Sequence, residues 1–109
     1  MTEISFQYSS EGVLVGSSAR GHAEDAPRGE SVVCAGISTV FELLLAGAED
    51  LPARAVSFRE DQQSAERKFA VDPERLSENS WEQFRLLLQS ARRVLKDMAE
   101  NHPRHCSIC

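Results

Sequence analysis

The chain has 109 residues, of which 41% are hydrophobic and 27% charged, and its formal net charge at pH 7 is −5. This length suits a single domain (residues 1–109) with one hydrophobic core, and the hydrophobic content excludes a disordered chain. The negative charge argues against direct nucleic-acid binding, because contacts to phosphates require clustered lysine and arginine.

The N-terminus and the cysteine count indicate the compartment. Residues 1–10 lack both the basic start and the apolar centre of a signal peptide. No apolar run approaches the roughly 20 residues needed to cross a bilayer. Three cysteines are an odd number, which fits reduced thiols better than a closed disulfide framework. We therefore expect a cytoplasmic protein that does not associate with membranes.

The first half of the chain predicts a hairpin followed by a helix. Apolar and polar side chains alternate in residues 4–9, which is typical of a half-buried strand, and residues 13–22 predict a second strand after a short turn. Apolar residues then recur at three- and four-residue steps, as they do on one face of a helix. We expect this helix to begin at Ser31, a good N-cap residue, and to end at Gly47.

The second half repeats this arrangement. Residues 54–59 and 64–72 predict two strands joined by a polar turn, although Arg67 interrupts the apolar face of the second. A longer helix follows from a cap near Ser77 or Ser80 and stops before Pro103. One stripe of this helix is apolar: Trp81, Phe84, Leu87, Leu88, Ala91, Leu95 and Met98.

Residues 104–109 are long enough for a final short strand. The predicted order is strand, strand, helix, strand, strand, helix, strand. Two amphipathic helices must bury their apolar stripes against another layer. The sequence therefore predicts an α+β fold with two layers, a mainly antiparallel sheet and two helices.

The candidate site lies around residues 20–37, where His22 ends a predicted strand and Cys34 lies in the first turn of a predicted helix. The free N–H groups and the dipole at a helix start favour thiolate over thiol. The loop between the two residues can return on itself and bring imidazole and sulfur together. Most cysteines in such positions only pack, and a single histidine at a strand end is usually a surface residue.

This stretch resembles the ribosomal-processing cysteine protease family, small bacterial proteins of the Prp type. The shared features are Gly21-His22-Ala23, Gly29 late in the loop, and the sequence VVCAGIS, which contains Cys34 and Ser38. The order of strands and helices and the length are similar as well, so the resemblance extends over essentially the whole chain.

The resemblance implies a Cys/His endopeptidase without a cofactor that removes the N-terminal extension of a large-subunit ribosomal protein during ribosome assembly, cutting after a hydrophobic sequence that contains phenylalanine. Cys34 would be the nucleophile, and His22 the general base and then the acid. Gly21 would let the strand end approach the substrate, and Ser38, one turn after Cys34, would support the nucleophile's surroundings. The resemblance also implies a homodimer. The wide apolar surface of the first predicted helix is compatible with one, and we expect Phe41 and Leu45 to contribute to it.

Two positions depart from the family pattern. Ser31 stands where the family commonly has aspartate, so this chain lacks a carboxylate that could orient the histidine. Gly36 stands where alanine is usual. The departure at Ser31 leaves a second interpretation open, in which the chain is a non-catalytic, ribosome-associated binding protein on the same scaffold.

The C-terminal residues His102, His105, Cys106 and Cys109 invite comparison with a zinc site. If residues 104–109 form a strand, Cys106 and Cys109 point to opposite faces and cannot bind one ion together. A loop would remove that objection. We predict a strand and no metal.

Overall fold

The computed structural model of the chain describes residues 1–21 and 28–109, and of residues 28–31 it describes the backbone alone. Its helices and strands are, in chain order, β1 (Thr2–Tyr8), β2 (Leu14–Arg20), α1 (Arg28–Gly47), β3 (Val56–Asp61), β4 (Glu66–Val71), α2 (Glu78–Asn101) and β5 (Cys106–Ile108). Short 3₁₀ helices, Ala53–Ala55 and Pro73–Arg75, precede β3 and α2. The predicted order of strands and helices is confirmed, including the final strand.

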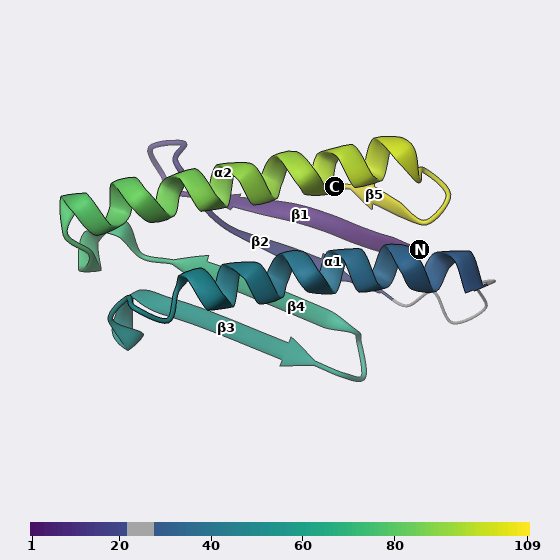
Figure 1. Cartoon of the computed structure of the whole chain (residues 1–109), viewed down its shortest axis with the longest axis horizontal. Helices are drawn as coiled ribbons and strands as arrows, with labels where there is room; N and C mark the ends of the chain where they lie inside the picture. The colour runs from purple at the N-terminus through teal and green to yellow at the C-terminus, as the bar shows by residue number, and fades with distance from the viewer. Residues whose placement is uncertain (22–27) are drawn as a thin grey trace.

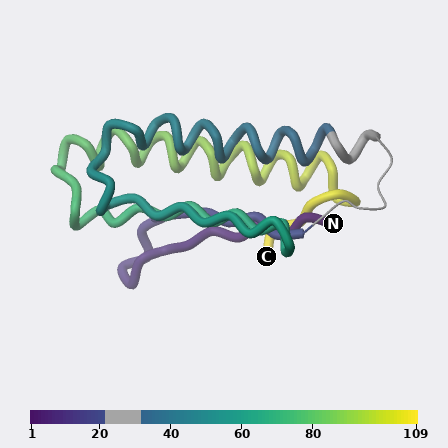
Figure 2. The backbone as a smooth tube through the Cα atoms, turned by 90° about the horizontal axis from the view of Figure 1, so that it is seen from below, coloured from purple at the N-terminus to yellow at the C-terminus, as the bar shows by residue number. Residues whose placement is uncertain are grey.

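The five strands form one sheet in the order β3-β4-β2-β1-β5. All neighbouring strands are antiparallel except β1 and β5, which are parallel. Figures 1 and 2 show both helices lying side by side on the same face of this sheet. The predicted two-layer α+β fold is therefore confirmed.

The core lies between the helices and this face. Its largest fully buried side chains are Phe41, Phe69, Ile4, Leu44, Leu95 and Cys106.

Helix α2 forms as its sequence predicts. The Ser77 side chain caps it by accepting a hydrogen bond from the backbone N–H of Ser80 at 3.1 Å. The apolar stripe buries Phe84, Leu88, Ala91 and Leu95 against the core. Within the described residues, neither α2 nor α1 is long and apolar enough to cross a membrane.

Helix α1 starts earlier than predicted. Its first residue is Arg28, so Ser31 is the fourth residue of the helix and not its N-cap, and that expectation is wrong. Arg28 and Glu30 are good helix formers, and Pro27 precedes them in the sequence, where proline is well tolerated ahead of a helix. These local preferences outweigh the capping preference of the serine. The predicted end at Gly47 is confirmed.

Gly36 allows a test of the contact between the two helices. A methyl group at this position would meet the tip of Met98 on α2, at 2.9 Å from Cε, and that tip can move aside. Alanine is better than glycine in a helix interior by about 1 kcal/mol. We expect Gly36→Ala to raise the free energy of unfolding by up to about 1 kcal/mol in urea denaturation. A loss of stability would show that Met98 cannot move.

Candidate active site

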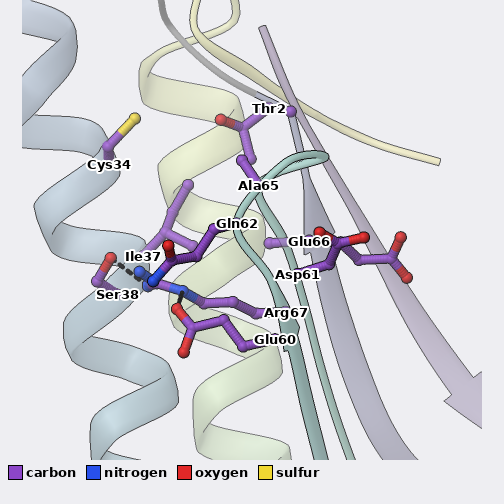
Figure 3. A pocket seen from close by; sticks show the side chains of 12 residues that line it. Thr2, Cys34, Ile37, Ser38, Glu60, Asp61, Gln62, Ala65, Glu66 and Arg67 are labelled. Carbon is purple, nitrogen blue, oxygen red and sulfur yellow. Dashed lines mark hydrogen bonds and ion pairs between the residues drawn. The ribbon is translucent and has the colours of Figure 1, made fainter.

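A cavity of about 340 Å³ opens between the N-terminal half of α1 and the end of the sheet where β3 turns into β4. Figure 3 shows side chains from α1 and from the β3–β4 hairpin converging on it. The lining residues are Thr2, Ala19, Gly21, Cys34, Ile37, Ser38, Glu60, Asp61, Gln62, Ala65, Glu66 and Arg67.

Cys34 is a half-buried free thiol on the α1 wall of the cavity. Because α1 begins at Arg28, Cys34 is the seventh residue of the helix, in its second turn. Free backbone N–H groups are confined to the first four residues, and the dipole effect fades after the first turn. The expectation that Cys34 lies in the first turn, where a helix start acts on the sulfur, is therefore wrong.

Gly21 lines the same cavity just after the end of β2. Its φ of +112° is a conformation that side chains with a Cβ rarely adopt. A Cβ at this position would also lie far inside contact distance of the Met1 carbonyl oxygen. Glycine is thus required here both by the backbone conformation and by the close approach of the Met1 backbone.

Ser38 is linked to the sheet by an arginine that the sequence analysis treated only as an interruption. Arg67 Nη1 donates a hydrogen bond to Ser38 Oγ, and Arg67 Nε donates to Glu60 Oε1 at 3.1 Å (Figure 3). Arg67 shares the helix-facing side of β4 with the buried Phe69 and Val71. The sequence therefore carried an indication that Arg67 has a special position: it is a charged residue where the alternation of β4 predicts an apolar one.

Charged residues of the β3–β4 hairpin line part of the cavity. Glu60, Asp61 and Glu66 line it beside Arg67, and Arg67 forms an ion pair with Glu60. The side chains of this pair are 34% and 45% exposed, so solvent screens their charges substantially.

Cys106 and Cys109 differ sharply in environment. Cys106 is 1% exposed on β5, and burial, with a smaller contribution from the charge of Cys34, raises the pKa of the Cys106 thiol. Cys106 therefore stays protonated over the range in which an ordinary thiol, with a pKa of about 8.5, begins to ionise. Cys109 is an exposed free thiol.

The C-terminal segment is a strand, as predicted, with Cys106 buried and Cys109 exposed. The rings of His102 and His105 lie 6.4 Å apart. Across the ranges 1–21 and 28–109, no group of three or more histidine, cysteine, aspartate or glutamate side chains is arranged to hold a metal ion.

Three of the predicted site residues, Gly21, Cys34 and Ser38, thus line one cavity. His22 and the Ser31 side chain lie outside the described residues. His22 follows Gly21 directly in the chain.

Comparison with known proteins agrees with the resemblance. The model of the family described as cysteine protease Prp matches residues 1–107. No curated protein matches the chain.

Several solved structures share the fold over nearly the whole chain. The essential ribosomal processing protease Prp from Staphylococcus aureus, in complex with a substrate peptide, is 18% identical with a TM-score of 0.78, covering 100% of this chain and 98% of that one. SMU.848 from Streptococcus mutans is 27% identical with a TM-score of 0.77, covering 99% and 91%. A second structure of the S. aureus protease carries a covalently linked product peptide and has a TM-score of 0.72 at 18% identity, covering 99% and 97%. Given the family match over residues 1–107, the chain belongs to the cysteine protease Prp family.

Proposed function

We propose that this protein is a cytoplasmic cysteine endopeptidase that removes the N-terminal extension of a large-subunit ribosomal protein during ribosome assembly. The observation that carries the proposal is that Cys34 lines an open cavity that is also lined by Gly21, the residue before His22. Family membership supplies the reaction class, and the S. aureus relative is a ribosomal processing protease that binds a substrate peptide.

The proposed reaction uses Cys34 and His22. The Cys34 thiolate attacks the scissile carbonyl carbon and forms a carbon–sulfur bond, which leaves a tetrahedral oxyanion. Collapse of this species breaks the carbon–nitrogen bond, and protonated His22 gives its proton to the leaving amine. Water, deprotonated by His22, then hydrolyses the thioester and returns the thiol. No step requires a metal or an organic cofactor.

The shape of the cavity supports a substrate with a large apolar residue. Ile37, Ala19 and Ala65 provide apolar wall beside Cys34. A volume of about 340 Å³ is sufficient for an aromatic side chain, and such pockets typically combine apolar walls with a few polar groups.

The proposed enzyme acts as a homodimer. Four large apolar side chains of the helices, Val32, Leu43, Leu86 and Val94, are exposed and are available for a contact between copies. The expected participation of Phe41 is wrong, because Phe41 is 1% exposed and belongs to the core of its own chain.

A peptide assay tests the proposal. The peptide copies the ribosomal protein's N-terminus across the end of the extension, and mass spectrometry reads the products. We expect cleavage at one bond, after the phenylalanine-containing sequence, and no cleavage of a scrambled peptide of equal composition. Binding of the peptide without cleavage would contradict the proposal and favour the non-catalytic binding protein that Ser31 leaves open.

A further inference from the structure

Arg67 extends a cation into the cavity from a position where the pattern of β4 predicts an apolar side chain. It shares the helix-facing side of the strand with the buried Phe69 and Val71, and its side chain is 34% exposed. Figure 3 shows it extending from β4 toward α1, where it meets Ser38 and Glu60. The guanidinium therefore spans from the sheet to the helix in the cavity that Cys34 also lines.

Two hydrogen bonds fix the orientation of this guanidinium. Its Nε donates to Glu60 Oε1 at 3.1 Å, and its Nη1 donates to Ser38 Oγ. A guanidinium is planar and rigid, so contacts from two of its nitrogen atoms to two different elements, β3 and α1, hold the whole group in place. Donors that are already held in place bind a ligand with a smaller loss of conformational entropy than mobile ones do.

The same guanidinium has further donors. It carries five N–H groups and has no acceptor. Among the described residues, the second N–H of Nη1 and both N–H groups of Nη2 have no acceptor. Water satisfies such donors while the cavity is open to solvent, but a peptide that fills the cavity displaces this water and must supply an acceptor in its place. Glu60 already pairs with the charge of Arg67, so an uncharged carbonyl oxygen suffices as this acceptor.

The spacing along α1 indicates which part of a bound peptide meets Arg67. Ser38, which contacts the guanidinium, follows Cys34 by about one helical turn, or about 5.4 Å along the helix axis. An extended peptide advances about 3.3 Å per residue. A peptide that runs from Cys34 toward Ser38 therefore brings to the guanidinium a residue about two positions from the cleaved bond.

We propose that Arg67 is a substrate-binding residue: its unpartnered N–H groups donate to a carbonyl oxygen of the peptide about two residues from the cleaved bond. This oxygen belongs either to the main chain or to a side-chain amide, which offer the same chemistry to a guanidinium. The proposal rests on the proposed function, in which Cys34 attacks a peptide that lies in this cavity.

Peptide binding to a Cys34→Ala background, in which nothing is cleaved, tests this role by fluorescence anisotropy. The probe is the peptide that spans the end of the extension. We expect Arg67→Gln to raise the Kd of this peptide by roughly tenfold, the scale of a hydrogen bond from a charged donor.

A double-mutant cycle between protein and peptide then locates the acceptor. Two series of peptides alter, one at a time, the three residues on each side of the cleaved bond. The first series replaces each side chain by alanine, and the second replaces each peptide bond by an ester, whose carbonyl oxygen is a weaker acceptor. One altered peptide should lose most of its sensitivity to Arg67→Gln. If it comes from the first series, the acceptor is a side-chain amide, and if from the second, it is the main chain.

Arg59→Gln is the matched control, because it removes the same charge from an exposed position of β3 next to Glu60, on the other side of the sheet. It should leave the Kd unchanged. Arg67→Met keeps a long side chain and removes every donor, and it replaces Arg67→Gln if that variant fails to fold. We expect it to raise the Kd to the same extent.

An unchanged Kd in the Arg67 variants would overturn the role of Arg67. An increase by the same factor for every peptide would overturn it too, because Arg67 would then only hold the hairpin against α1. Coupling to one altered peptide, in a protein that cleaves no peptide when Cys34 is present, would overturn the proposed function alone. Cleavage without such coupling would overturn the role of Arg67 alone.

Discussion

Replacing Cys34 by alanine should lower peptide cleavage by roughly 10³-fold or more, because the covalent route is lost entirely when the sulfur is removed. The loss should appear in kcat, with little change in peptide binding, since the substitution removes one atom from a cavity whose other walls are intact. Cleavage rates from mass spectrometry and peptide binding by fluorescence anisotropy measure the two quantities separately. The folded state should persist, because Cys34 is half-buried and its removal leaves no enclosed void.

Cys109→Ser is the control for this experiment. It also removes one thiol, but from an exposed position outside the cavity, and it should cleave at the wild-type rate. If Cys34→Ala cleaved as fast as the wild type, Cys34 would not be the nucleophile.

Replacing Gly21 by alanine should lower the free energy of unfolding by about 2–4 kcal/mol. The backbone at φ +112° is unfavourable for any residue with a Cβ, which costs about 1–2 kcal/mol. The new methyl group also collides with the Met1 carbonyl oxygen, which adds about 1–2 kcal/mol. The Met1 carbonyl is backbone directly before the paired residue Thr2, and it cannot move aside as a side-chain tip can. Urea denaturation followed by circular dichroism measures the change.

Gly12→Ala separates the two causes. Gly12 has φ +80°, but a Cβ there would meet nothing within 4 Å. This variant should therefore show the conformational cost alone, about 1–2 kcal/mol. Equal losses in the two variants would mean that the collision at Met1 contributes nothing, because the backbone at Met1 moves aside.

The helices and strands were predictable where the apolar pattern is long or regular. Helix α2 has seven apolar residues at helical spacing and a serine cap, and both are present in the structure. The start of α1 was not predictable in this way, since Ser31 resembles a cap while the residues before it also favour a helix. A capping preference is worth about 1 kcal/mol, and the helix preferences of the residues in the neighbouring turn easily outweigh it.

The candidate site was predictable only in part. The resemblance named Gly21, Cys34 and Ser38, and these line one cavity. Arg67 and Glu60 reach the cavity through the register of β3 and β4, in which they are directly paired. Registers between strands depend on the turn and on the packing of both faces, so a single sequence does not place such partners.

The pairing of the first strand with the last has a consequence for how the protein matures. Thr2 lines the cavity, and its N–H bonds to the carbonyl of His105 at 2.9 Å, while Thr2 and Cys106, 104 positions apart (106 − 2), are partners in the parallel pair. A polypeptide still emerging from the ribosome lacks this support until residue 106 has been made. The cavity lined by Thr2 would therefore be complete only after synthesis has passed that point.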